Sequence, residues 1–182
     1  MQGRFVPRAI LTDDVGMPAL RTALPIVVVV ALLAAALAQL RLGDDEDAAI
    51  RGTVVRVVDG DTIGVRTGER VERVRYIGVD TPESVKPGTP VQCFAEAAHG
   101  LNARLVAGRR VRLVTDAERR DRYGRLLAYV YRDGDGLFVN AELVRRGYAQ
   151  TLTIPPNVRF ATRLSALARQ ARAEGSGLWS AC

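Results

Sequence analysis

TVVRVVDGDT, residues 53–62, is a β-rich run that ends in a two-residue turn signal. Valine and threonine dominate positions 53–58, and β-branched side chains favour the extended conformation. Asp59-Gly60 favours a tight hairpin, because both residue types tolerate the positive φ angles that such a turn requires. The stretch therefore predicts one strand over 53–58, a turn at Asp59-Gly60 and a return strand over 61–66.

Three further strand-like segments follow this hairpin. Residues 71–79 alternate between two mixed faces, and Gly78 would permit a bend or a bulge near the end of that strand. Two short β-rich runs at 111–115 and 125–131 complete the set. Together with the hairpin they predict five short strands.

Helical patterns are interleaved with these strands, and a glycine follows each of them. Residues 92–107 carry an apolar stripe at helical spacing. Asn140 is predicted to cap a second helix that ends at Arg146, and a third helix is predicted over 157–174. We therefore expect an α+β, mainly β fold: a five-stranded OB-type Greek-key barrel with three packed helices, one of them inserted after the third strand.

An N-terminal hydrophobic segment precedes this region. The uncharged run ALPIVVVVALLAAALA occupies residues 23–38 and extends to Leu40 if Gln39 is tolerated. Its length is at the short edge of a membrane-spanning helix, which needs about 17–25 residues. The A-x-A pattern at 36–38 is typical of signal-peptide cleavage. We predict a signal peptide or a membrane anchor over 23–40, and export of the region that follows.

The hydrophobic run also sets the predicted domain boundaries. Residues 1–22 form an N-terminal tail, 41–49 an acidic linker and 50–182 the folded domain. Translation from Met17 would replace the tail with a compact leader. A buried core helix is the alternative interpretation of the run, and the acidic linker disfavours it by separating the run from the folded region.

The two cysteines bear on the prediction of export. Cys93 lies close to the start of the first helical pattern, and Cys182 is the last residue of the sequence. In an oxidising compartment an even pair suggests a disulfide that ties down the C-terminus. Two unpaired thiols remain the alternative.

Charge points to an anionic partner. The formal net charge is +6 and the basic excess lies mostly from Ile50 onward. A basic folded region favours nucleic acid or an anionic membrane surface, although a solvated arginine-rich surface would give the same balance. Aromatic residues make up only 5% of the chain, so stacking on bases cannot be the main source of affinity.

Two short motifs place oxygen ligands at the ends of predicted strands. Asp61 opens the return strand, where threonine or valine would pair better, and Asp80 follows the 71–79 strand directly. A purely structural interpretation places Asp61 in a hairpin turn and Asp80 at a strand end. The chemical interpretation joins both carboxylates and the Thr81 carbonyl in an open Ca²⁺ site. Glu83 lies close enough to act as a general base or to position water.

Two arginines complete a possible phosphate site. Arg75 shares one face of its strand with positions 77 and 79, and Arg125 follows a Tyr-Gly turn. Each could be a solvated surface residue. Alternatively, the two planar guanidiniums clamp one phosphate from two sides and neutralise the charge that builds up during attack by water.

Two weaker candidates carry no function. The segment Asp133-Gly134-Asp135-Gly136 resembles part of a calcium loop but lacks the spaced ligands, so we predict a hairpin turn. His99, the only histidine, lies in the middle of a predicted helix and is interpreted as a structural residue, and the sequence has no cluster of His and Cys for a zinc site.

Taken in order, these motifs resemble those of a staphylococcal-nuclease-like (thermonuclease) domain. The resemblance covers about Gly52 to Trp179. It rests on the DGDT hairpin, the R-x4-DTPE strand and loop, the D-x-YGR-x-L-A-Y segment ending at Tyr129, the FVNAELVRRGYA helix and the terminal GLW.

The resemblance implies an OB-type barrel that hydrolyses DNA and RNA with Ca²⁺ and leaves 3′-phosphate ends. It implies that Asp61, Asp80 and the Thr81 carbonyl hold the metal and that Arg75, Glu83 and Arg125 are catalytic. Arg122 and Tyr123 match family residues that contact the terminal phosphate of a bound nucleotide.

One segment departs from the family pattern. The best-known member has two tyrosines after the second helix that pack beside the nucleotide, and here Thr153 and Pro155 are predicted to take their places. Base stacking, worth about 1–3 kcal/mol per base, would then be weakened.

The leading hypothesis is therefore an exported, Ca²⁺-dependent nuclease of low sequence specificity, expected to act as a monomer on DNA and RNA. A non-catalytic nucleic-acid-binding barrel tethered to the membrane is the alternative, and a membrane-tethered protein scaffold is a third. Because all five predicted site side chains are present, the first hypothesis is favoured over the second.

Overall fold

The computed structural model describes residues 49–83, 88 and 90–182, all within a compact unit over Asp45–Cys182. The predicted hairpin forms from strands β1 (Ile50–Val57) and β2 (Thr62–Thr67), which pair antiparallel. The amide of Val58 donates to the Thr62 carbonyl at 2.9 Å and closes the turn. The Asp59-Gly60 signal therefore sets the register in which Asp61 enters β2.

Five strands close into a barrel in the order β1-β2-β3-β6-β5. The other members are β3 (Arg70–Tyr76), β5 (Arg110–Val114) and β6 (Leu126–Arg132). The β3–β6 pair is parallel and the remaining pairs are antiparallel. This arrangement confirms the predicted five-stranded OB-type barrel.

Alternating side chains of these strands fill the barrel. Successive residues of a strand point to opposite faces, so every second residue enters the core. The fully buried inward positions include Val54, Ile63, Val65, Val74, Val111, Leu113, Ala128 and Val130. The intervening residues face outward, and the arginines of β1, β2 and β3 lie among them.

The predicted strand over 71–79 is divided in two. β3 ends at Tyr76, and Gly78 adopts φ 79° and begins the short strand β4 (Gly78–Asp80). A Cβ on Gly78 would lie 2.5 Å from Leu164 Cδ1, so helix packing also excludes a side chain there. The bend anticipated at Gly78 turns Asp80 away from the barrel wall.

β4 pairs with β7 (Gln150–Leu152), a strand that the sequence did not predict. The three paired positions are Gly78 with Leu152, Val79 with Thr151 and Asp80 with Gln150. This two-stranded sheet holds the segment after the second predicted helix against the end of β4.

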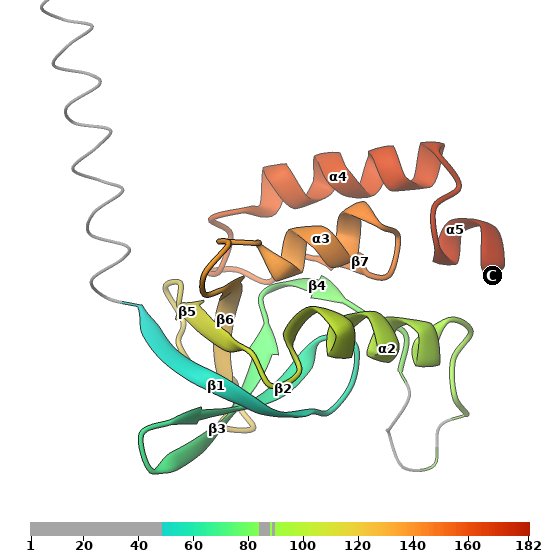
Figure 1. The fold of residues 1–182 in the computed structure, drawn as a ribbon. Helices are drawn as coiled ribbons and strands as arrows, with labels where there is room; N and C mark the ends of the chain where they lie inside the picture. Colours follow the sequence, from blue (N-terminus) through green and yellow to red (C-terminus); the bar gives the residue numbers. More distant parts are fainter. Residues whose placement is uncertain (1–48, 84–87, 89) are drawn as a thin grey trace, which may run out of the picture. The chain divides into compact units, whose positions relative to one another are not determined.

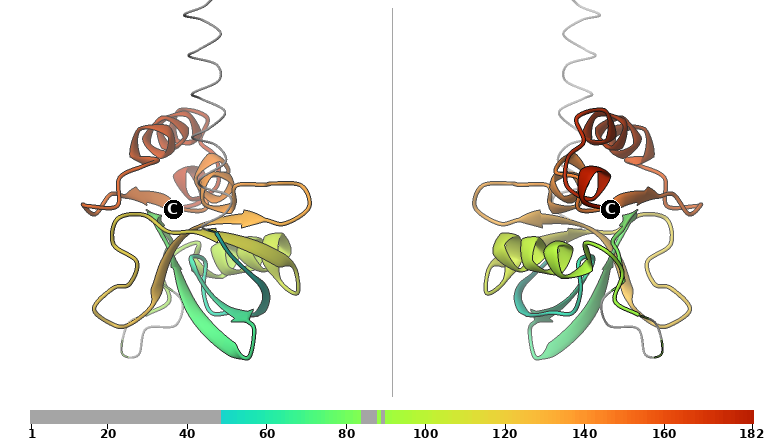
Figure 2. Two further views of the ribbon diagram at one scale, coloured as in Figure 1. Left: turned by 90° about the vertical axis from the view of Figure 1, so that its left-hand side faces the viewer. Right: turned by 90° about the vertical axis from the view of Figure 1, so that its right-hand side faces the viewer.

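Helices cover one side of the barrel, as Figures 1 and 2 show. α3 (Val139–Arg145) packs on β6 and on α4 (Ala161–Ala173), whereas α2 (Ala95–Val106) packs on β1 and α3. A short helix α5 (Leu178–Ala181) follows near the C-terminus. The prediction of three helices packed against the barrel is confirmed, with α5 as an additional turn.

Two predicted helix starts are wrong. Asn140 does not cap its helix but lies inside α3, fully buried, where its side chain accepts from the Val130 amide and donates to the Ile77 carbonyl. Asn157 precedes α4 by four residues and instead bonds the backbone of Glu118 at both its amide and its carbonyl. Both asparagines serve long-range contacts, which a local capping rule cannot anticipate.

Cys93 and Cys182 form a disulfide, with Cα atoms 6.0 Å apart. The bond joins the residue just ahead of α2 to the end of the chain after α5. The predicted tail, signal or anchor segment and most of the acidic linker lie outside the described residues. Among the residues that are described, no helix is long and apolar enough to cross a membrane.

Candidate active site

Six residues predicted from three separate motifs line one small hollow. The β1–β2 turn contributes Asp61, β3 contributes Arg75, and β4 with the loop after it contributes Asp80, Thr81 and Glu83; Arg125 comes from the loop before β6. The hollow has a volume of about 70 Å³, and Asp59, Thr62 and Pro82 complete its lining. The fold therefore brings together every predicted metal and catalytic residue.

Asp61 is buried and oriented by hydrogen bonds on both carboxylate oxygens. Its Oδ2 accepts from the Thr81 amide at 2.9 Å and from Thr81 Oγ1 at 3.0 Å, and its Oδ1 accepts from Thr62 Oγ1 at 3.1 Å. A Cβ at Gly60 would lie 2.7 Å from the Thr81 side chain, so this approach requires glycine. The two loops are thereby joined at the hollow.

Arg75 lies between the two predicted metal carboxylates. Nη1 is 3.1 Å from Asp61 Oδ2, and Nη2 donates to Asp80 Oδ1 at 2.8 Å. Nη1 also donates to the carbonyls of Tyr76 and Val79 at 3.1 and 2.8 Å. Because both ends of the guanidinium are anchored, the side chain is held in one orientation at the edge of the hollow.

Arg125 is held by Asp121, a residue to which the sequence interpretation gave no role. Arg125 Nε donates to Asp121 Oδ2 at 2.7 Å, and the amides of Arg125 and Tyr123 both donate to Oδ1. Burial alone raises the pKa of Asp121, but these hydrogen bonds outweigh it and hold the pKa below its ordinary value. The D-x-Y-G-R spacing is the local signal for this loop.

Asp59 also lines the hollow, beyond the turn role predicted for it. Burial, followed by the neighbouring charge of Asp61, raises the pKa of the Asp59 carboxyl. Its Oδ1 nevertheless accepts from the Asp61 amide at 3.0 Å. Asp59 therefore adds negative potential next to the predicted metal carboxylates.

Glu83 is fixed through its backbone by Gln92. The Glu83 amide donates to Gln92 Oε1 at 2.9 Å, and the Gln92 amide donates to the Glu83 carbonyl at 3.0 Å. These two bonds hold the main chain of Glu83 beside the hollow.

The donor set suits a hard cation. The carboxylates of Asp61 and Asp80 and the carbonyl of Thr81 offer only oxygen atoms, which Ca²⁺ prefers as ligands. Water would supply the rest of its coordination shell. Within the described part of the chain, no group of three or more His, Cys, Asp or Glu residues is arranged to hold a metal. The preference for a hard cation therefore rests on the oxygen chemistry of Asp61, Asp80 and Thr81 alone.

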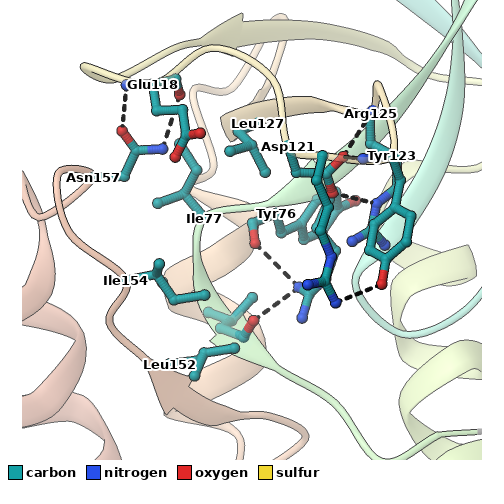
Figure 3. Close-up of a pocket in the computed structure, with 14 residues that line it drawn as sticks. Tyr76, Ile77, Glu118, Asp121, Tyr123, Arg125, Leu127, Leu152, Ile154 and Asn157 are labelled. Carbon is teal, nitrogen blue, oxygen red and sulfur yellow. Dashed lines mark hydrogen bonds and ion pairs between the residues drawn. The ribbon is translucent and has the colours of Figure 1, made fainter.

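A larger pocket of about 450 Å³ adjoins the hollow, and Arg75 and Arg125 line both (Figure 3). Tyr123 is 68% exposed at its edge, and Arg122 Nη2 donates to the Tyr123 hydroxyl at 2.7 Å. The lining combines aliphatic side chains with polar ones: Ile77, Leu127, Leu152 and Ile154 lie with Glu118, Asp121 and Asn157.

Two residues that the sequence did not single out line this pocket. They are Leu152 and Ile154, whereas Thr153 and Pro155 are not part of its lining. Pairing of Leu152 with Gly78 sets the register, and residues two apart share one face of an extended segment. That Thr153 and Pro155 take the places of the two family tyrosines stays a prediction.

Comparison with known proteins agrees with this geometry. Residues 73–181 match the family described as Staphylococcal nuclease homologue. The chain is 43% identical over 126 residues to a thermonuclease of Staphylococcus intermedius and 41% identical over 127 residues to one of Staphylococcus hyicus, in both cases covering 74% of the relative. It is 38% identical to the endonuclease YncB of Bacillus subtilis, over 70% of this chain and 61% of that protein. The chain therefore belongs to the staphylococcal nuclease family.

Proposed function

We propose that the protein is an exported, Ca²⁺-dependent nuclease that hydrolyses DNA and RNA with little sequence specificity and leaves 3′-phosphate ends. Membership of its family makes the protein a nuclease, a hydrolase of phosphodiester bonds. The observation that carries the finer proposal is the single hollow in which two carboxylates, two arginines and Glu83 meet.

Arg75 and Arg125 would hold the scissile phosphate. They reach the hollow from β3 and from the loop before β6, and Asp121 or backbone carbonyls anchor each guanidinium. Attack by water adds negative charge to the equatorial phosphate oxygens, and fixed guanidiniums stabilise that charge without reorganising. Two planar forks on different elements also orient the phosphate.

Glu83 would receive the proton of the attacking water, or position that water. A carboxylate can do this when it lies within hydrogen-bond reach of the water. Asp61, Asp80 and the Thr81 carbonyl would hold the Ca²⁺, which supplies Lewis-acid polarisation of the phosphate when bound. Asp61 is pre-oriented for this role by Thr62 and Thr81.

The adjoining pocket would take the sugar and base. Arg122 and Tyr123 lie at its edge, where a terminal phosphate would meet a guanidinium and a hydroxyl. Ile77, Leu127, Leu152 and Ile154 would offer apolar contact area to a base of any identity. Low sequence specificity is proposed because the two arginines would grip the phosphate, and phosphate contacts carry no sequence information.

Export is part of the proposal. The hydrophobic segment 23–40 with its A-x-A pattern supports a signal peptide or an anchor. The Cys93–Cys182 disulfide is consistent with an oxidising compartment. We propose that the domain acts there as a monomer.

Analysis of the product ends tests the reaction. The purified protein is incubated in Ca²⁺ with single-stranded DNA or RNA whose original 3′ end carries a phosphatase-resistant block, and the fragments are offered to an enzyme that extends free 3′-hydroxyls. We expect extension only after phosphatase treatment, for both substrates. Fragments that are extended without phosphatase would contradict the proposed direction of cleavage.

A further inference from the structure

A groove on the outer face of the barrel lies beyond the hollow and its adjoining pocket. It has a volume of about 440 Å³ and is lined by Val55, Arg56, Val58, Gly64, Val71 and Arg73 from strands β1, β2 and β3 and the turn after β1. None of these lining residues is acidic.

Strand register explains how two arginines meet there. Gly64 on β2 pairs with Arg56 on one side and with Arg73 on the other, so all three residues lie in one row across the sheet. Gly64 has no side chain, which leaves the floor between the two arginines open. The row therefore presents two guanidiniums to one recess.

These arginines differ from most others on the barrel. Arg51, Arg110 and Arg120 each form an ion pair with an aspartate or a glutamate. Within residues 49–83 and 90–182, neither Arg56 nor Arg73 forms such a pair. Their charge is therefore available to an anion.

The groove continues the active-site face. Arg73 and Arg75 lie two residues apart on β3, on the same outward face and about 7 Å apart along the strand. Exposed Val55 and Val71 add apolar surface beside the guanidiniums, which suits the sugars and bases of an extended strand.

We propose that this groove is a subsite for the nucleic-acid backbone next to the scissile phosphate, with Arg56 and Arg73 each contacting a phosphodiester. This inference rests on the proposed nuclease function. Charge complementarity and continuity with Arg75 select a polyanionic strand as the occupant.

Substrates of two lengths distinguish an effect on this subsite from an effect on the active site, because only the longer one can reach the groove. The double variant Arg56→Ala/Arg73→Ala is compared with the unmodified full chain on a dinucleoside monophosphate and on a 20-nucleotide strand. We expect the ratio of kcat/KM for the long substrate to that for the short one to fall roughly tenfold, since each charged hydrogen bond contributes to binding. The slope of log(kcat/KM) against log[salt] for the long strand should also become shallower by roughly 0.7 per arginine.

Arg169→Ala on α4 is the matched control, because Arg169 is exposed and lines neither the groove nor the active-site pockets. It should leave the ratio unchanged. An unchanged ratio in the double variant would overturn the subsite. Absence of hydrolysis of either substrate by the unmodified protein would instead contradict the nuclease function.

A second, independent observation concerns Gln92. It bonds both the amide and the carbonyl of Glu83, and its neighbour Cys93 is covalently linked to Cys182. Gln92 thus connects the backbone of Glu83, the predicted general base, to the Cys93–Cys182 disulfide.

We infer that Gln92 is a positioning residue for Glu83 and that the disulfide fixes Gln92 in turn. This inference also rests on the proposed nuclease function. A displacement of about 1 Å at a catalytic group can cost roughly a hundredfold in rate, so loss of this support should lower kcat. KM should change little, because Gln92 is not among the residues that line the hollow or the adjoining pocket.

Two variants of Gln92, a control variant of Gln170 and a variant of Cys182 test this inference. Gln92→Leu removes the side-chain acceptor and should lower kcat roughly tenfold or more, whereas Gln92→Glu keeps an acceptor and should retain most of kcat. Gln170→Leu, at an exposed glutamine of α4, is the control. Cys182→Ser should lower kcat in the same direction as Gln92→Leu.

Circular dichroism of each variant confirms that the barrel is folded before rates are compared. Wild-type kcat in Gln92→Leu would overturn the inference, as would an equal loss in Gln92→Leu and Gln92→Glu. An inactive unmodified protein in Ca²⁺ would count against the nuclease function itself.

Discussion

Arg75 and Asp61 form an ion pair in which Nη1 lies 3.1 Å from Oδ2, and Nη2 of the same guanidinium bonds Asp80. One arginine therefore contacts both carboxylates that we assign to the metal. The Arg75 and Asp61 side chains are only 14% and 7% exposed, so their ion pair is poorly screened by water, whereas the Asp80 side chain is 57% exposed. The predicted phosphate ligand and the predicted metal ligands form one electrostatic unit.

Replacement of Arg75 by lysine tests the geometry of this unit separately from its charge. A lysine keeps the positive charge but cannot span two carboxylates and two backbone carbonyls with a planar fork. We expect Arg75→Lys to lower kcat by roughly a hundredfold or more. Steady-state kinetics with a dinucleoside monophosphate gives the value, and full activity of the lysine variant would show that charge alone suffices.

Asp121 predicts a defined pH dependence of stability. Hydrogen bonds from Arg125 and Tyr123 hold the folded-state pKa of Asp121 below its unfolded value. The stabilisation is therefore fully present above the unfolded pKa of about 3.9 and is lost as the pH falls through the lower folded-state pKa. The difference in melting temperature between wild type and Asp121→Asn should be constant from pH 7 to 5 and shrink below pH 4. An equal difference at pH 2 and pH 7 would contradict this assignment.

The disulfide should contribute strongly to stability. Cys93 and Cys182 are 89 residues apart in sequence, and closing a loop of that length removes about 4–5 kcal/mol of chain entropy from the unfolded state in the loop-entropy account. Urea unfolding with and without a thiol reductant measures the effect. The Cys93→Ser/Cys182→Ser double variant is the control, since it should not respond to the reductant. Identical unfolding midpoints for the oxidised and reduced wild type would refute the prediction.

Asn140 links three parts of the fold that position the site. Its buried amide group joins α3 to β6 at Val130 and to the β3–β4 bend at Ile77. Asn140→Ala would leave a buried amide and a buried carbonyl without partners, and should lower the free energy of unfolding by roughly 2–4 kcal/mol. Chemical denaturation measures this value, and a change below about 1 kcal/mol would mean that other groups satisfy the two backbone atoms.

Sequence reasoning predicted the barrel because its determinants are local. The Asp59-Gly60 turn, the β-branched residues of β1 and the bend at Gly78 each act on neighbouring residues, and most of the strands were predicted within a residue or two of their observed ends. The Asp133–Gly136 turn formed as predicted, with Asp135 bonded to Arg132 rather than placed for a cation. His99 lies inside α2 and lines none of the pockets described above.

The features that the sequence did not predict depend on distant contacts. β7 exists because Gln150–Leu152 pairs with β4, about 70 residues earlier in the chain. That pairing places Leu152 and Ile154 in the pocket wall instead of Thr153 and Pro155. Asn140 was predicted to cap its helix and Asn157 to begin the next one, but tertiary contacts use both side chains elsewhere.

In the candidate site, too, some residues were predicted from the sequence and others were not. Its six predicted members come from short motifs, and each motif carries its own strand end or turn. The supporting roles of Asp121 and Gln92 were missed, although Asp121 bonds Arg125 within the D-x-Y-G-R loop and Gln92 bonds Glu83 nine residues away. The roles of the six predicted residues as metal ligands and catalytic groups stay predictions until rates are measured.

The most direct measurement is the initial rate of phosphodiester hydrolysis as a function of free Ca²⁺, for wild type and Asp80→Asn. We predict no hydrolysis by the wild type in excess EDTA and a rate that rises to saturation when Ca²⁺ is restored. Asp80→Asn removes one of the two proposed carboxylate ligands, so the variant should require roughly tenfold more Ca²⁺ or more. A wild-type rate that is the same in EDTA and in Ca²⁺ would contradict the proposed metal-assisted mechanism.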